Sequence, residues 1–100
     1  VLLREGTAGS DAFKAAVDRE LNHFEEELHA DLVRYDVGSS RPLHQPRVVA
    51  RAVTRLVFAL GATAMDRPAS ADAELAEQMT AMVRMILLGA RSMGERTRKP

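Results

Sequence analysis

Two Glu-x-x-His pairs come nearest to metal chemistry in this 100-residue sequence: Glu20–His23 and Glu26–His29. Residues three apart share a helix face, and helical bundles that hold two metal ions use this spacing. Such sites also need carboxylates from other helices, and the next apolar segment has no acid before Asp66. The two His are six residues apart and point in different directions. A solvated acidic face is the favoured interpretation, and we expect no metal and no cofactor.

The sequence also shows no arrangement of residues typical of nucleophilic catalysis. The sequence has no Cys, and its Ser residues fall in caps, loops or helix ends. The glycine-containing segment Gly6–Gly9 lacks the Lys-Ser/Thr of a phosphate-binding loop. We therefore expect a protein that is not an enzyme. With 14 basic and 14 acidic residues, the net charge of zero argues against a nucleic-acid-binding surface on this chain.

Composition and periodicity predict an all-α fold. The sequence is 46% hydrophobic and dominated by helix-forming residues. Helices are expected over 11–35, from Pro46 to about Asp66, and from Ser70 or Asp72 onward, with Pro46 and Pro68 marking breaks. A leading helix tail is expected to end at Gly6–Gly9. The prediction is one domain over residues 1–100, an antiparallel bundle of three long helices plus this tail. No apolar run reaches the roughly 18 residues of a membrane span, and the lack of Cys fits a cytoplasmic location.

The first two helices have apolar stripes with charged flanks. Residues spaced three or four apart, from Phe13 to Tyr35, predict one buried face of the first helix. Its outer face is acidic, whereas the second helix begins with a row of Arg47, Arg51 and Arg55. This row could bind an anionic ligand or pair with the acidic helix. A solvated flank with weak surface ion pairs is the favoured reading.

The last helix is apolar on two faces. One stripe is Leu75, Met79, Met82, Ile86, Ala90 and Met93, and we assign it to the core. A second stripe and the end of the preceding helix would leave large apolar side chains in water, which monomers rarely tolerate. A homodimer with a two-fold four-helix bundle would cover them. The expected interface is Phe58, Ala62, Met65, Ala81, Met85, Leu88 and Ser92. Swapping the two stripes of the last helix remains possible.

Several short segments of the expected helices then suggest a family. They are Leu2-Leu3-Arg4-Glu5, Ala12-Phe13-Lys14-Ala15-Ala16-Val17, Glu20-Leu21-Asn22-His23-Phe24, Val83-Arg84-Met85-Ile86 and Gly89-Ala90. Together they resemble the C-terminal regulatory half of TetR-family transcriptional repressors, and most closely the FabR/DesT-type branch that controls unsaturated fatty-acid synthesis. The resemblance implies a fragment whose helix-turn-helix domain, upstream of Val1, reads a palindromic DNA operator as a dimer.

The resemblance also implies a small apolar effector, in this branch a long-chain acyl-CoA, lying among the apolar side chains of the bundle. Residues chosen from the stripes as its cavity are Phe13, Val17, Phe24, Leu28, Val53, Leu56 and Leu60. Coenzyme A would need basic partners, for which Arg47 or Arg51 are candidates. The alternative from another class is a structural helical dimerisation module without a ligand, in which the same stripes are ordinary core.

Overall fold

Three long helices make up the protein in a computed structural model that describes the backbone of residues 2–98 and the side chains of residues 11–94. They are α1 (Leu2–Asp36), α2 (Pro46–Met65) and α3 (Asp72–Arg98), with a 3₁₀ turn, η1 (Ala69–Ala71), before α3. The described backbone contains no strand, so the all-α prediction is confirmed. Val1, Lys99 and Pro100 of the predicted domain lie outside it.

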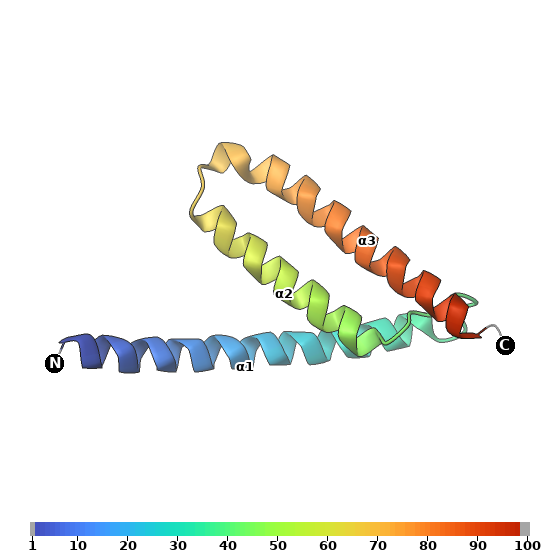
Figure 1. The fold of residues 1–100 in the computed structure, drawn as a ribbon, viewed down its shortest axis with the longest axis horizontal. Coiled ribbons are helices and arrows are strands. Elements are labelled where there is room, and N and C mark those ends of the chain that lie inside the picture. Colours follow the sequence, from blue (N-terminus) through green and yellow to red (C-terminus); the bar gives the residue numbers. More distant parts are fainter. Residues whose placement is uncertain (1, 99–100) are drawn as a thin grey trace.

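The helices form an open arrangement. The antiparallel pair α2 and α3 makes a hairpin. The C-terminal part of α1 crosses the start of α2, and its N-terminal part diverges from the hairpin (Figure 1). The molecule is consequently long and thin, 62 × 31 × 21 Å along its principal axes. Pro46 occupies the first turn of α2, as the sequence predicts, because its missing N–H needs no partner there.

The expected break at Gly6–Gly9 is wrong, because α1 continues through it without interruption. Each glycine costs a helix only about 1 kcal/mol relative to alanine. The segment has no proline, which is the residue that removes a backbone donor and forces a break. The leading tail and the first long helix are therefore one element.

The loop between α1 and α2 is fastened to α3. The Asp36 carboxylate, at the end of α1, accepts a 2.8 Å hydrogen bond from the Leu43 N–H and pairs with Arg91 of α3 at 3.4 Å. The His44 N–H donates to the Ala90 carbonyl at 2.9 Å. These contacts fix the closed end of the molecule, where all three helices meet.

The main cluster of buried residues is small and lies at this closed end. Its central cluster is Leu43, Val49 and Ala90, against which Leu32, Val53, Ile86 and Leu87 pack. In α3 the expected core stripe is only partly confirmed, because Leu75 and Ala90 are buried whereas Met82 and Met93 are 39% and 52% exposed. Met93 lies at the closed end and is exposed because it lines an open groove with Val48 and Ala52.

Helix α2 is strongly apolar, although the sequence contains no uninterrupted apolar run long enough to span a membrane. By length and composition alone it could cross a membrane, with a mean hydropathy of 1.5 over 18 residues. That stretch contains Arg51 and Arg55, both paired with acids of α1, and charged residues in lipid are costly. Only 17% of the stretch is buried. We read this hydropathy as apolar surface that α1 and α3 leave uncovered.

A substitution at Gly94 tests the close contact between α3 and the loop. A Cβ atom there would lie 2.5 Å from the Pro42 carbonyl oxygen and 3.3 Å from the His44 nitrogen. We expect Gly94→Ala to lower the free energy of unfolding by about 1–3 kcal/mol in urea, because the backbone of the loop must move. Gly61→Ala is the matched control. Nothing lies within 4 Å of a Cβ at that helical glycine, so it should gain up to about 1 kcal/mol. Equal effects would contradict the close approach.

Candidate functional site

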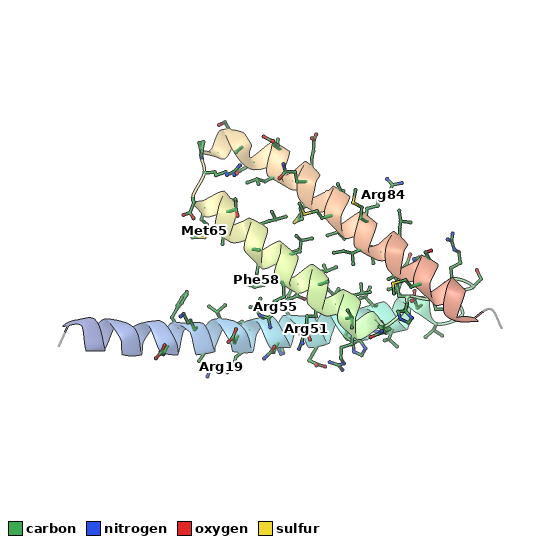
Figure 2. The ribbon with its side chains drawn as sticks, viewed as in Figure 1. Arg19, Arg51, Arg55, Phe58, Met65 and Arg84 are labelled. Atoms are coloured by element: carbon green, nitrogen blue, oxygen red, sulfur yellow. The ribbon has the colours of Figure 1, made fainter. Side chains whose placement is uncertain are left out.

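An apolar groove lies between α1 and α2, where the two helices diverge. We call it the wedge, and its volume is about 690 Å³, within the range of small-molecule sites. The described residues that line it are all apolar: Phe13, Val17 and Leu21 of α1, and Val57, Phe58, Ala59, Gly61, Ala62 and Met65 of α2. Phe58 and Met65 mark its α2 wall in Figure 2.

The wedge exposes large side chains to water. Phe13 is 70% exposed and Met65 is 88% exposed. Towards the closed end, Phe24 of α1 meets Phe58 edge-to-face, with ring centroids 6.4 Å apart and planes at 77°. Burying a side chain of this size is worth about 1.5–3 kcal/mol. An occupant that covered both walls would therefore gain binding free energy from contacts that the chain does not make by itself.

An ion-pair ladder crosses from α1 to α2 beside the wedge. Its three arginines are four residues apart on one face of α2, and each faces an acid: Arg47 with Glu26 at 2.5 Å, Arg51 with Glu25 at 3.1 Å, and Arg55 with Asp18 at 3.9 Å. The arginine row thus pairs with the acidic helix, one of the alternatives that the sequence left open. The ladder sets the position at which α1 crosses α2.

The three pairs differ in strength. The Glu25 side chain is only 4% exposed and accepts a hydrogen bond from Arg51 Nε. Arg47 grips Glu26 with two nitrogens, and this hydrogen bonding and charge lower the pKa of the Glu26 carboxyl below its ordinary value of 4.5. At 3.9 Å, the third pair is the longest, and 45% of the Arg55 side chain is exposed. The ion pairs that hold α1 against α2 therefore become weaker towards the wedge.

The residues expected to line an effector cavity are divided between several places. Phe13 and Val17 line the wedge, and Phe24 contacts its Phe58 wall. Val53 packs on the central cluster, and Leu60 lines a separate groove between α2 and α3. Leu28 and Leu56 are half-buried. The wedge also includes Val57 and Gly61, which the sequence reasoning missed because neither falls on the stripe assigned to the cavity.

All seven residues expected at a dimer interface are exposed in the single chain: Phe58, Ala62, Met65, Ala81, Met85, Leu88 and Ser92. They do not form one surface. Phe58, Ala62 and Met65 line the wedge, whereas Met85 lies in another groove with Val48, Ala52, Gly89 and Met93. Leu88 borders a third groove along α3.

We call Val48, Ala52, Met85, Gly89 and Met93 the hairpin face. Residues two apart on a helix point about 200° apart, so Val48 and Ala52 point away from the side of α2 that carries the buried Ala50 and Thr54. The hairpin face is therefore turned away from α1. The small residues Ala52 and Gly89 at its centre are the sequence signal that was missed, because small residues let another helix approach closely.

The Glu-x-x-His pairs take other partners. His23 Nε2 lies 3.2 Å from Glu27, and His29 Nδ1 lies 3.4 Å from an Arg47 nitrogen. Within the described part of the chain, no group of three or more His, Asp or Glu could hold a metal ion. These residues belong to the solvated flank of α1.

Comparison with known families gives one match. The model of a family described as "Tetracyclin repressor-like, C-terminal domain" matches residues 1–89, which contain α1, α2 and most of α3. No solved structure matches the chain.

Arg51 tests the ion-pair ladder. Removing its charge leaves the Glu25 carboxylate buried without its partner. We expect Arg51→Gln to lower the free energy of unfolding by about 1–3 kcal/mol in urea. Arg55→Gln is the control on the same helix face, and it should change stability by less than about 1 kcal/mol because its pair is long and exposed. A larger loss from Arg55→Gln would reverse the order of strength.

Proposed function

The chain belongs to the tetracyclin repressor-like C-terminal domain family, and we propose that it is the effector-binding and dimerisation domain of a TetR-type transcriptional repressor. Domains of this family generally dimerise, bind small-molecule effectors and are typically not enzymes. Contact with operator DNA is assigned to a separate helix-turn-helix domain. The neutral charge of this chain fits that division.

The wedge carries the proposal that an effector binds here. It is an apolar groove of about 690 Å³ between two helices that cross near the start of α2 and diverge from there (Figure 1). A ligand seated between α1 and α2 would favour one angle between them. Because α1 would link the hairpin to the DNA-binding part, its angle would set the separation of the two DNA-binding domains. The shift can be no larger than the ligand's differential affinity for the two arrangements allows.

The hairpin face carries the proposal of a homodimer. It is an apolar surface across α2 and α3 on the side away from α1. Two such hairpins related by a two-fold axis make a four-helix bundle. The outward stripe of α3, which contains Ala81, Leu88 and Ser92, would flank this contact. Phe58, Ala62 and Met65 are assigned to the wedge and not to the dimer.

The finer proposal concerns the ligand. The apolar lining of the wedge and the resemblance to the FabR/DesT-type branch support a long acyl chain as the ligand, and hence control of lipid metabolism genes. Arg47 and Arg51 are engaged by Glu26 and Glu25, which leaves them poorly placed to bind coenzyme A. The alternative is a structural dimerisation module without a ligand. It is favoured if the wedge is filled by protein when the chain dimerises.

Gly89 tests the dimer. Outside its own helical turn, nothing in the described part of the chain lies within 4 Å of a Cβ at this position, so Gly89→Leu should leave the single chain folded. In the dimer the added side chain would hold the partner hairpin away, at a cost of about 1–3 kcal/mol, or roughly 5- to 150-fold in dissociation constant. Sizing with light scattering should give twice the 11.0 kDa chain mass for the wild type and a larger monomer fraction for the variant.

The control is Ala73→Leu, which adds apolar bulk to an exposed position of α3 away from the hairpin face. It should dimerise like the wild type. A wild-type chain that is monomeric at micromolar concentration would contradict the homodimer. An unchanged dimer in Gly89→Leu would move the interface elsewhere.

Ala62 tests the effector site. Thermal shift against fatty acids and acyl-CoAs of graded chain length should show stabilisation by at least one series that rises with chain length, since each buried methylene adds about 0.8 kcal/mol. Ala62→Trp fills the wedge and should abolish this shift while the chain remains folded. Ala73→Leu again serves as the control that keeps it. No stabilisation of the wild type by either series would favour the module without a ligand.

A further inference from the structure

We infer that the wedge selects an amphiphile with one negative charge, whose head group binds Arg55 and whose apolar body lies between Phe13 and Phe58. This inference rests on the proposed function only in taking the wedge as the ligand site. It adds the charge of the ligand and the residue that recognises this charge.

Arg55 is the arginine of the ladder whose N–H groups are not used in hydrogen bonds to α1. Its contact with Asp18, at 3.9 Å, is too long for a hydrogen bond, and within the described residues Arg55 donates none. By contrast, Arg47 and Arg51 each donate at least one hydrogen bond to an acid of α1. A guanidinium offers five N–H donors in a planar fork that matches a carboxylate. Arg55 therefore retains the capacity to bind an anionic head group.

Its position joins this charge to the wedge. Arg55 lies one helical turn before Phe58 on α2, and Asp18 follows Val17, a residue of the α1 wall. Figure 2 places Arg55 at the closed end of the wedge, between Phe58 and Arg51. A ligand with its head at Arg55 can therefore extend its body towards Met65 at the open end.

The surrounding charges favour a single negative charge. Arg19 points away from α2 on the far side of α1 (Figure 2), so it supplies no second cation inside the wedge. Among the residues whose side chains the structure describes, no polar one lines the groove itself, so a second charged group would lose water there without gaining a partner. Asp18, which is 68% exposed on its side chain, must turn away when the head group arrives. It is therefore a competitor that weakens binding.

Three probes with the same twelve-carbon chain separate head-group charge from apolar burial: dodecanoate, 1-dodecanol and dodecyltrimethylammonium. Each is titrated calorimetrically into the purified 100-residue chain below its micelle concentration. We expect dodecanoate to bind about tenfold tighter than the alcohol, as one hydrogen bond to a charged group allows. The cationic probe should bind most weakly.

Variants assign the preference to Arg55. Arg55→Gln should remove the tenfold preference while leaving the affinity for 1-dodecanol unchanged. Asp18→Asn should tighten dodecanoate binding severalfold, because the competing carboxylate is lost. Arg84→Gln is the control, since this arginine lies on α3 away from the wedge (Figure 2) and should change nothing.

The outcomes distinguish this inference from the proposed function. Equal binding of dodecanoate and alcohol, both abolished by Ala62→Trp, would overturn the charge selection and leave the wedge as an apolar effector site. A dodecanoate preference that survives Arg55→Gln would also overturn it. Binding of none of the three probes overturns both the inference and the effector site. A concentration-dependent loss of the dodecanoate signal on dimerisation would show that a second copy fills the wedge, and this too would overturn the inference.

Discussion

The ion pair between Glu25 and Arg51 is the contact on which the arrangement depends. It places a carboxylate that is 4% exposed beside a guanidinium that is 66% exposed, where α1 crosses α2. Because one partner is buried, breaking the pair costs far more than breaking a surface pair. The pairs of Arg47 and Arg55 on either side then orient the two helices. The crossing is thus fixed along the ladder from Glu26 to Asp18, and the two helices diverge beyond it.

This single crossing explains why the chain leaves so much apolar surface uncovered. The core is gathered where the three helices meet around Val49 and Ala90, and beyond it α1 diverges from the α2–α3 hairpin (Figure 1). Two apolar surfaces result: the wedge between α1 and α2, and the hairpin face on the far side of the hairpin. They point in different directions, so one partner cannot cover both. A small ligand for the first and a second copy for the second is the division that the proposed function makes.

Much of the fold could be predicted from the sequence, and the reasons for the failures are physical. The spacing of apolar residues, Pro46 and Arg67-Pro68 located α2 and its antiparallel partner. The break at Gly6–Gly9 failed because glycine weakens a helix without stopping it. The wedge was not predictable because periodicity gives the apolar faces of a helix but not the angle at which helices cross. The sequence therefore placed Phe58 and Met65 at a dimer interface and gave no indication that they line the wedge opposite α1.

Native mass spectrometry of the chain purified from cells tests the central claim most directly, because it reports assembly and bound ligand in one spectrum. The account predicts a species of twice the 11.0 kDa chain mass that carries additional mass from a small apolar anion. That mass should be released on denaturation and identified in the extract. A spectrum with only the single-chain mass and no bound molecule, at micromolar concentration, would contradict it.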